Sequence, residues 1–430
     1  MIKKIVIIGG GAGGLELATD LGDKLGKRNQ AEITLIDKNS YHIWKPLLHE
    51  VATGVLSEQA DKIDYTTQGQ QHAFQFIQGA FTDLNREEKQ VIINNSNNES
   101  VSVPYDILVV AIGSTSNDFG TPGVKEHCIF LDDQNAAIRL RETLIAKFAS
   151  FCSIIDENEA KDEDKIRIAI VGGGATGVEL ASELPHMVET FGTCGRNKMC
   201  SDLLDVSVIE ATDRILPALP EKTALGITKT LQQRGIHVLT NTMITKAQSD
   251  GFYPKEGDII SADIMIWTAG VKAPDYLKDI ARLESSRSNQ LVVKPTLQTT
   301  RDDNIFVIGD CAYAMQDSGR ASPATAQAAH QMAKICYENI INKLNNKPMK
   351  LFKYTDNGTI ISLHDTAQGV VKIAGKGEMN VKGFFALMIH RLLYRMHQAS
   401  LLGIVKTIRF VKASKEMYKN KFASIFTHQD

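Results

Sequence analysis

The sequence KIVIIGGGAGG at residues 4–14 joins a run of apolar residues to a cluster of glycines. The apolar run predicts a buried strand, and residues 15–25 predict a helix directly after the glycines. Residues 32–36 predict a second strand, which ends at Asp37. Strand, glycine turn, helix and strand in this order predict a βαβ unit.

The spacing of the glycines indicates what this unit binds. Gly9 permits a tight turn, Gly11 lets a pyrophosphate approach the backbone, and Gly14 lets the helix pack closely on the strand. The helix N-terminus stabilises the phosphate charge. Asp37 stands 23 residues after Gly14, where a carboxylate can accept hydrogen bonds from an adenosine ribose. Glycine triplets alone are common, but with the strand, helix and acid they predict dinucleotide binding.

The same order of elements returns in a second unit. Residues 167–171 predict a strand, 172–177 the glycine turn, 178–190 a helix and 205–209 a strand that ends at Glu210. Gly172, Gly174 and Gly177 take the three glycine roles. Glu210 follows Gly177 by 33 residues, so its assignment depends on its place at the strand end; the alternative is a solvated acid. A carboxylate there repels a 2′-phosphate and favours NADH over NADPH.

Further patterns divide the rest of the chain. Residues 263–270 repeat the strand and small-residue turn of residues 106–114, so the duplication extends beyond the glycines, and 151–165 is a polar, acidic connector. The predicted fold class is α/β, with two Rossmann-like dinucleotide-binding domains and a C-terminal membrane-associating region with amphipathic helices. The expected domains are the first part of one dinucleotide-binding domain at 1–160, a second dinucleotide-binding domain at 161–285, a return to the first domain at 286–348, and the C-terminal region at 349–430.

Composition and charge limit the partners. The 430 residues are 43% hydrophobic and 23% charged with a net charge of −2, which is typical of a globular protein and argues against nucleic acid as a partner. Residues 376–421 are an exception, with ten Lys and Arg against two acids. The six cysteines show neither disulfide nor metal-ligand spacing, so we expect reduced thiols and no metal. We expect neither an export signal nor a helix that spans a bilayer.

Two dinucleotide units imply a hydride donor and a flavin. The chain resembles the two-dinucleotide-binding-domain flavoproteins, the glutathione-reductase-like superfamily, over residues 3–345, where residues 300–310 look like the second flavin motif ending in Asp310. Residues 41–54 lack the redox cysteine pair of the disulfide reductases. That segment, the sequence AQAAHQ at 326–331 and the basic C-terminus resemble the type II, single-subunit, non-proton-pumping NADH:quinone oxidoreductases.

The resemblance assigns FAD binding to 1–160 and 286–348, NADH binding to 161–285, and membrane anchoring with quinone access to 349–430. It also assigns roles to individual residues. It implies that FAD is bound by Gly9, Gly10, Gly11, Ala12, Gly13, Gly14, Asp37, Lys38, Asp310, Ala326, Gln327 and Lys382. It implies that Gly172, Gly174, Gly177 and Glu210 bind NADH, that Glu179 approaches the flavin, and that Gln327 and Gln331 border the quinone pocket. The chain departs from the minimal pattern at 190–204.

Each candidate residue also has a structural interpretation. Gln327 and Gln331 share one helix face, which could be an exposed polar stripe. The alanines around them suggest instead a helix packed against something flat, which we interpret as the flavin and quinone. Glu179 could serve only the electrostatics of its helix terminus. Cys311, beside Asp310, is interpreted as a small buried apolar residue. Residues 384–396 and 401–411 predict two basic amphipathic helices for an anionic lipid surface, or a helical pair that completes a homodimer.

The sequence therefore predicts a peripheral flavoenzyme on the cytoplasmic face of the inner membrane. It would take a hydride from NADH onto tightly bound FAD and pass two electrons to a membrane quinone without pumping protons. Two alternatives stay open. A sulfide:quinone oxidoreductase has the same fold but needs a cysteine in the later flavin domain, and none follows Cys336. A non-catalytic NADH-sensing flavoprotein would use the same two nucleotide motifs.

Overall fold

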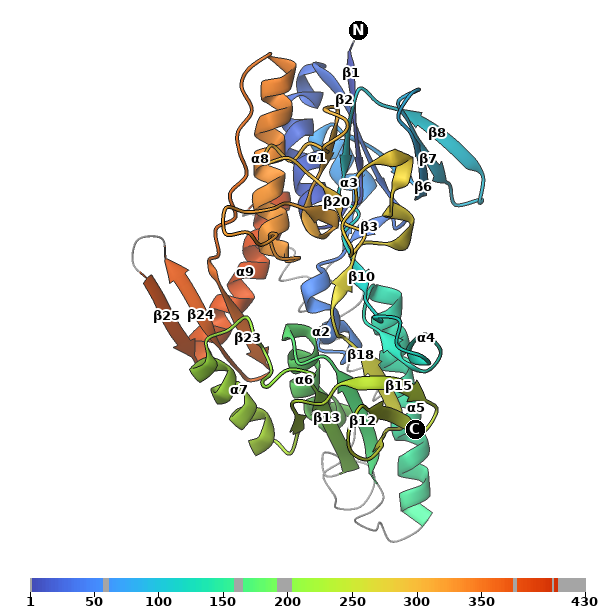
Figure 1. Cartoon of the computed structure of the whole chain (residues 1–430), viewed down its shortest axis with the longest axis vertical. Coiled ribbons are helices and arrows are strands. Elements are labelled where there is room, and N and C mark those ends of the chain that lie inside the picture. The colour runs from blue at the N-terminus through green and yellow to red at the C-terminus, as the bar shows by residue number, and fades with distance from the viewer. Residues whose placement is uncertain are drawn as a thin grey trace.

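The computed structural model describes residues 2–56, 62–157, 165–191, 203–373, 377–403 and 406–408, and the side chains of all of these except 152–157 and 190–191. The molecule is elongated, with one nucleotide-binding unit at each end and a small C-terminal sheet at one side (Figure 1). The predicted α/β class and the two Rossmann-like units are confirmed.

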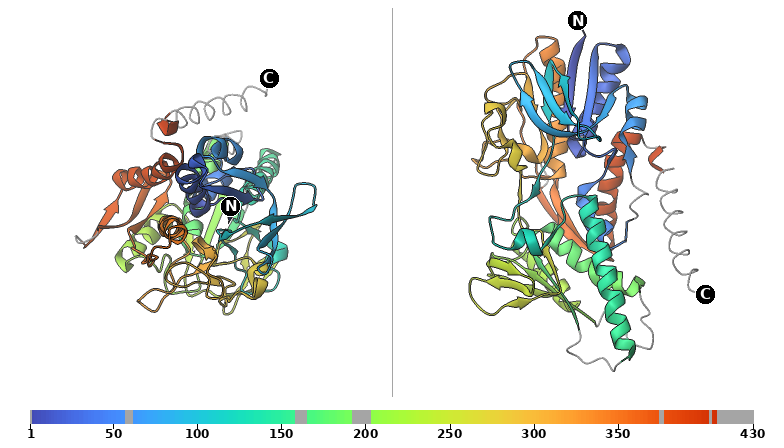
Figure 2. Two further views of the ribbon diagram at one scale, coloured as in Figure 1. Left: turned by 90° about the horizontal axis from the view of Figure 1, so that it is seen from above. Right: turned by 90° about the vertical axis from the view of Figure 1, so that its right-hand side faces the viewer.

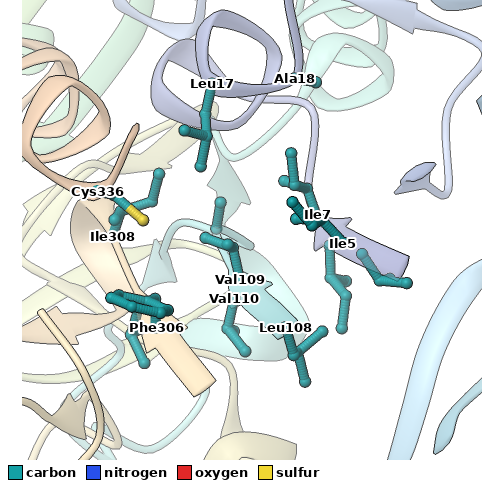
Figure 3. Close-up of a cluster of buried hydrophobic side chains, with 14 of the residues drawn as sticks. Ile5, Ile7, Leu17, Ala18, Leu108, Val109, Val110, Phe306, Ile308 and Cys336 are labelled. Carbon is teal, nitrogen blue, oxygen red and sulfur yellow. The ribbon is translucent and has the colours of Figure 1, made fainter. Parts of the chain in front are cut away.

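The first unit is a five-stranded parallel sheet in the order β21-β9-β1-β2-β5. Its elements are β1 (Lys3–Ile8), α1 (Ala12–Lys24), β2 (Ala31–Asp37), β5 (Gln75–Gln78), β9 (Ile107–Val110) and β21 (Ile305–Val307). The apolar runs of β1, β9 and β21 are buried on both faces, as is typical of a parallel sheet covered by helices, whereas the edge strand β5 is partly exposed. Figure 3 shows side chains of β1, β9 and β21 meeting Leu17 of α1 and Cys336 in one core.

The second unit repeats this plan in the order β11-β18-β12-β13-β14. Its elements are β11 (Ile129–Phe130), α5 (Gln134–Glu157), β12 (Ile166–Val171), α6 (Ala175–Phe191), β13 (Leu204–Ile209), α7 (Glu221–Gln233), β14 (His237–Leu239) and β18 (Ile264–Trp267). The second sheet thus takes in β11 and α5, which precede the predicted boundary at 160, and α5 continues into the predicted connector. Most of the unusual 190–204 stretch lies outside the described residues.

The duplication extends to a small antiparallel sheet in each unit. β6 (Ala80–Asn85), β7 (Gln90–Asn94) and β8 (Ser100–Pro104) precede β9, and β15 (Ile244–Gln248), β16 (Gly251–Pro254) and β17 (Ile260–Ser261) precede β18. After β9 and β18 the chain crosses between the units, and the two crossings pair as antiparallel strands β10 (Thr115–Ser116) and β19 (Val271–Lys272).

The C-terminal region begins with α8 (Ala326–Leu344), which packs on α1. An antiparallel sheet follows, made of β23 (Gly358–Leu363), β24 (Thr366–Ile373) and β25 (Gly377–Lys382). β23 packs on α6 and β24 on α7, so this sheet covers the second unit. α9 (Phe384–Leu402) then runs from the sheet back to α1 (Figure 2). Of the second predicted amphipathic helix, 401–411, the structure describes 401–403, where α9 ends, and 406–408, which are helical.

Candidate functional site

A pocket of about 390 Å³ opens at the carboxyl end of β1 and β2. Carboxyl ends of parallel strands are where open α/β sheets bind ligands. The lining includes Gly9, Gly10, Gly11, Asp37 and Lys38, five of the residues predicted to hold FAD. The short elements between β2 and β5, β3 (Tyr41–His42), α2 (Leu48–Ala52) and α3 (Tyr65–His72), add Tyr41, His42, Leu48 and Tyr65 to the wall.

The first glycine turn has the predicted geometry. Gly9 has a φ of +98°, and a Cβ there would lie 2.4 Å from the Ala111 carbonyl oxygen. A Cβ on Gly14 would lie 1.8 Å from the Gly9 oxygen, so helix and turn can meet only without a side chain. A Cβ on Gly11 would meet no protein atom within 4 Å. The open space in front of Gly11, at the N-terminus of α1, fits a pyrophosphate.

Asp37 is fixed beside this turn. Its Oδ2 accepts a hydrogen bond from the Gly10 amide at 2.7 Å, and its Oδ1 accepts one from the Asn39 amide at 2.8 Å. Burial raises the pKa of Asp37, although these two hydrogen bonds act in the opposite direction. Lys38 is exposed, with its Nζ 3.7 Å from Asp133 Oδ2, and both residues line the pocket.

The second turn repeats this arrangement. Gly172 has a φ of +116°, a Cβ on Gly177 would lie 2.1 Å from the Gly172 oxygen, and Gly174 is open. Glu210 Oε2 accepts a hydrogen bond from the Gly173 amide at 2.9 Å, which is the position Asp37 occupies relative to Gly10. Glu210 Oε1 accepts hydrogen bonds from the amide and hydroxyl of Thr212, both at 2.9 Å. The assignment of Glu210 by strand position therefore has the same geometry as the better-spaced Asp37.

Asp310 lies next to the pocket. It stands in a 3₁₀ turn, Gly309–Cys311, and its Oδ2 accepts a hydrogen bond from Ser114 Oγ at 2.7 Å. Ser114 lines the pocket. The neighbouring Cys311 is buried, and burial raises the pKa of its thiol to about 12, so it is a protonated apolar side chain at neutral pH.

The two glutamines of α8 are engaged with the segment that leads into β23. Gln327 Oε1 accepts hydrogen bonds from Tyr354 Oη at 2.9 Å and from the Asn357 amide at 3.0 Å. Gln331 bonds both backbone groups of Thr355, at 2.7 and 2.9 Å. We call residues 354–358 the strap. Gln327 and Gln331 hold the strap on α8, and neither lines the described pocket.

The small residues of α8, which were predicted from the sequence to form a face packed on flavin and quinone, pack against another part of the protein. Ala328, Ala329 and Ala333 are buried, and a Cβ on Gly13 would lie 2.9 Å from the Ala329 carbonyl oxygen. The flat surface against this face is therefore the backbone of α1, which explains both the alanines and Gly13. Ala326 begins α8, where Thr325 caps the helix by accepting a hydrogen bond from the Ala328 amide at 3.2 Å.

Lys382 is exposed at the end of β25, opposite Gln368, and does not line the pocket. The structure thus brings the first glycine turn, Asp37 and Lys38 to one pocket with Asp310 beside it, whereas Ala326, Gln327 and Lys382 do not line this pocket.

Glu179 is buried between α6, α2 and the C-terminal sheet. Its Oε1 accepts a hydrogen bond from the Ser362 amide at 3.0 Å, and its Oε2 lies 3.7 Å from His49 Nδ1. Burial, together with the nearby carboxyls of Glu50 and Glu183, raises the pKa of Glu179 to about 8, although the hydrogen bond from Ser362 acts in the opposite direction. Burial lowers the pKa of His49 to about 4, so this imidazole is neutral. A carboxyl that titrates near neutral pH is suited to proton transfer.

Sequence reasoning missed a cluster that joins the first glycine turn to α9. His42 Nδ1 lies 2.8 Å from the Gly10 carbonyl oxygen, and its Nε2 lies 3.1 Å from His397 Nε2. The Trp44 ring packs on His397 at 4.0 Å between centroids. Burial lowers the pKa of His42 to about 4 and that of His397 to about 2, so the two neutral rings share one proton between facing nitrogens. Residues 355 apart carry no local signal for such a contact.

Tyr65 was also missed. Its hydroxyl donates a hydrogen bond to the Gly10 oxygen at 2.8 Å, and a Cβ on Gly10 would lie 2.3 Å from that hydroxyl. Gly10 is therefore required by a side chain and not by the turn itself. Among the described residues no group of three or more His, Cys, Asp or Glu side chains is arranged to hold a metal ion.

The chain is similar in sequence to known proteins. A family model described as pyridine nucleotide-disulphide oxidoreductase matches residues 3–333. The type II NADH:quinone oxidoreductase of Haemophilus influenzae is 48% identical over 423 residues, which cover 94% of this chain and 95% of that protein. The protein of the same name from Staphylococcus aureus strain NCTC 8325 is 31% identical over 89% of this chain and 92% of its own.

Solved structures share the fold. NDH2 from Plasmodium falciparum in complex with NADH has a TM-score of 0.80 at 19% identity, over 97% of this chain and 98% of that one. The sulfide:quinone oxidoreductase from Aquifex aeolicus has a TM-score of 0.72 at 16% identity, over 93% and 92% of the two chains.

Proposed function

The chain belongs to the pyridine nucleotide-disulphide oxidoreductase family and, within it, to the type II NADH:quinone oxidoreductases, and from this premise we propose how its residues divide the reaction. It is an FAD-dependent enzyme that oxidises NADH and reduces a quinone, and this reading is favoured over sulfide oxidation and over a non-catalytic sensor. Bound FAD supplies a ring that accepts a hydride from a nicotinamide and returns electrons to a quinone.

The observation that carries the proposal is the matched pair of glycine turns. Each turn has one open glycine at a helix N-terminus and one carboxylate on the adjoining amide. We assign the first turn, with Asp37, Lys38 and Asp310, to FAD, because it adjoins the pocket of about 390 Å³. We assign Gly172, Gly174, Gly177 and Glu210 to NADH. Ala326 and Gln327 would hold FAD through α8, and Lys382 would have to approach it by a movement of β25.

Rapid mixing tests the whole path. Under anaerobic conditions, NADH should bleach the yellow protein, and a soluble quinone should then restore its colour. A flavin that NADH bleaches but no quinone reoxidises would contradict quinone reduction and favour the sensor.

The choice of nucleotide depends on Glu210. We expect Glu210→Gln to lower the preference for NADH over NADPH by roughly tenfold, because the amide keeps an acceptor for Gly173 but no longer repels a 2′-phosphate. The ratio of kcat/KM for the two nucleotides measures this preference. Thr212→Val is the matched control, since it removes a hydroxyl partner of Glu210 and leaves the carboxylate. Equal kcat/KM values in the unmodified enzyme would refute the assignment.

Quinone access depends on α8 and the strap. We expect Gln327→Leu to keep FAD and its fast reduction by NADH but to slow reoxidation by quinone about tenfold or more, because the strap loses three hydrogen bonds to this side chain. Stopped-flow absorbance separates the two half-reactions. Tyr354→Phe removes one strap bond and leaves Gln327, so a normal Tyr354→Phe enzyme would assign the effect to the glutamine itself. Impaired reduction with intact reoxidation would move Gln327 out of the quinone site.

The lipid surface is the proposed partner of α9. One face of α9 carries six large apolar side chains that are 52–78% exposed: Phe384, Phe385, Met388, Leu392, Leu393 and Met396. We call this set the α9 apolar face. An exposed patch of this kind marks an interaction site, and Arg391 beside it suits anionic lipid. No helix in the described ranges is long and apolar enough to cross a bilayer. We propose peripheral attachment on the cytoplasmic face, with a homodimer through α9 as the alternative.

A further inference from the structure

The wall of the FAD pocket includes Lys45. This residue begins a short 3₁₀ turn, Lys45–Leu47, which leads directly into α2, and Pro46 restricts the backbone of that turn. The Lys45 ammonium donates a hydrogen bond to the Ser114 carbonyl oxygen at 3.2 Å. Ser114 follows β9 and lines the same pocket. The ammonium is thus held against the wall that follows β9.

The order of the strands indicates which part of FAD lies near this ammonium. Along the carboxyl edge of the first sheet, β2 ends at Asp37, β1 leads into the glycine turn, and β9 leads to Ser114. An acid at the end of the second strand binds the adenosine ribose, and the glycine turn binds the pyrophosphate. In FAD the ribityl chain and the flavin ring follow the pyrophosphate. The ribityl chain and the ring therefore belong on the β9 side, where the Lys45 ammonium lies.

The charge of Lys45 is not used by an acid in the part of the chain that the structure describes. The other lysine of the lining, Lys38, has Asp133 Oδ2 3.7 Å from its Nζ, whereas no carboxylate oxygen of the described residues lies within 4.0 Å of Lys45 Nζ. Asp37 and Asp132, which also line the pocket, accept hydrogen bonds from backbone amides. The Lys45 charge is therefore available to a ligand in this pocket.

The other ionisable side chains of the lining come from the segments between β2 and β5 and after β19. Burial lowers the pKa of His42 to about 4 and raises the pKa of Tyr276 to about 12, so both are neutral at neutral pH. Burial also raises the pKa of Tyr65, whose hydroxyl donates to the Gly10 oxygen. Tyr41 has the ammonium of Lys62 over its ring, 4.0 Å from the centroid. None of these groups replaces Lys45 as a cation on the β9 side.

The reaction creates a negative charge on the cofactor. A hydride carries two electrons and one proton, so its transfer turns NADH into NAD⁺ and turns the neutral oxidised flavin into an anion. A second proton, taken from water, turns this anion into neutral reduced flavin. A cation near the ring favours the anion over the oxidised ring and over the neutral reduced ring, because only the anion gains an attraction to it.

We propose that the Lys45 ammonium stabilises the anionic reduced flavin and so sets how readily FAD accepts the hydride. The role is electrostatic, and no bond to Lys45 forms or breaks. The proposal rests on the assignment of this pocket to FAD. A purely structural role would use the same side chain, because the hydrogen bond to Ser114 also ties the turn before α2 to the wall after β9. The test must therefore separate charge from structure.

Four variants make this separation. Lys45→Met removes the charge and keeps the apolar stem, and Lys45→Gln removes the charge but keeps a hydrogen-bond donor. Lys45→Arg keeps both the charge and a donor. Lys62→Met is the matched control, since it removes a lysine of the same segment that does not line the pocket. Flavin absorbance after purification and the thermal unfolding midpoint show that each variant is folded and holds FAD.

The first measurement is the midpoint potential of the bound FAD as a function of pH, and it needs neither NADH nor quinone. Anaerobic reduction by dithionite beside a dye of known potential gives this value. At high pH, where the reduced flavin is an anion, Lys45→Met and Lys45→Gln should lower the equilibrium constant for reduction about tenfold, which is about 30 mV for a two-electron couple. At low pH, where the reduced flavin is neutral in every variant, the potentials should agree. Lys45→Arg and Lys62→Met should follow the unmodified protein.

Two results would overturn the proposal. Potentials equal to those of the unmodified protein at every pH would show that the Lys45 charge does not act on the flavin. A shift of the same size at every pH, shared by Lys45→Arg, would indicate the structural tie to Ser114. If neither neutral variant retains FAD while Lys45→Arg does, the ammonium holds the oxidised cofactor, and selective stabilisation of the reduced form is wrong.

The second measurement follows the two half-reactions by stopped-flow absorbance. Reduction by NADH should slow by up to tenfold in Lys45→Met, because the negative charge develops during hydride transfer. Reoxidation by quinone should not slow, because a less stable reduced flavin gives up its electrons more readily. Normal reduction with slow reoxidation would contradict the proposal. An unmodified protein whose FAD is reduced by dithionite but not by NADH would instead refute the proposed function, and the midpoint potentials would still test Lys45.

Discussion

Valine at Gly11 is expected to give a folded protein without FAD, and valine at Gly174 is expected to give a yellow protein that NADH does not reduce. Both positions are open, since a Cβ there would meet no protein atom within 4 Å. Gly11 also has ordinary extended backbone angles, φ −66° and ψ −168°. A valine at either position should therefore leave the protein folded, but its side chain fills the space through which a pyrophosphate approaches the turn.

The two variants are controls for each other. Flavin absorbance after purification measures FAD content, and bleaching by NADH against bleaching by dithionite measures the second turn. We expect at least a 100-fold loss of the affected ligand in each case, which is roughly 3 kcal/mol. Gly14→Ala is a third variant, which should destabilise the fold and not merely block a ligand, because its Cβ would lie 1.8 Å from the Gly9 oxygen. Full FAD content in Gly11→Val would overturn the assignment of the first turn.

Substitutions that make the α9 apolar face polar are expected to abolish binding of the protein to membranes. Three substitutions, Phe385→Ser, Leu392→Gln and Leu393→Ser, remove side chains that are 52–78% exposed and so contribute little to the core. Burial of each in lipid is worth roughly 1.5–3 kcal/mol, so the triple variant should leave anionic vesicles almost completely. Salt should weaken membrane binding of the unmodified protein without abolishing it, because salt screens only the electrostatic contribution of Lys and Arg to the binding free energy.

Sedimentation of the protein with vesicles, prepared with and without anionic lipid, measures its membrane binding. Removal of residues 384–430 should also release the protein, but α9 packs on Ile360 and Ala367 and contacts His42, so truncation disturbs the interior as well. Leu225→Gln, at an exposed leucine of α7, is the matched control and should bind normally. Reduction of a long-tailed quinone should fall further than transfer to a soluble dye. If the triple variant still sediments and instead changes from dimer to monomer, the face is a homodimer interface.

The elements that sequence predicted well are those with a local pattern. The strands of both glycine units have continuous apolar runs, and the predicted helix 15–25 differs from α1 mainly by beginning three residues later. Glu210 could be assigned despite its spacing because the strand end, and not the distance along the chain, sets the carboxylate against the Gly173 amide. By contrast, β11 has two residues and no period, and α5 ends in polar residues, so both were missed as parts of the second unit.

The site residues that sequence missed depend on contacts between distant parts of the chain. His42 and His397 form a hydrogen bond only because the fold brings them together. The Tyr65 hydroxyl donates a hydrogen bond to the carbonyl of Gly10, 55 residues earlier in the chain. The alanines of α8 were correctly read as a close-packing face, but their partner is the backbone of α1 at Gly13. A pattern shows that a face is buried, whereas only the assembled fold shows against what.

The hydrogen bond between His42 and His397 has a consequence for how the protein is assembled. The His42 ring contacts the carbonyl of Gly10 in the turn that we assign to FAD, and His397 belongs to the helix that carries the α9 apolar face. Docking of α9 and binding of the cofactor both involve this turn, so the two events are thermodynamically linked. If α9 docking favours cofactor binding by a given free energy, cofactor binding favours α9 docking by the same free energy. A newly made chain that has not yet acquired its flavin would hold this helix less firmly. Delivery to the bilayer would then follow cofactor insertion, and chains lacking flavin would be the ones most open to proteolysis.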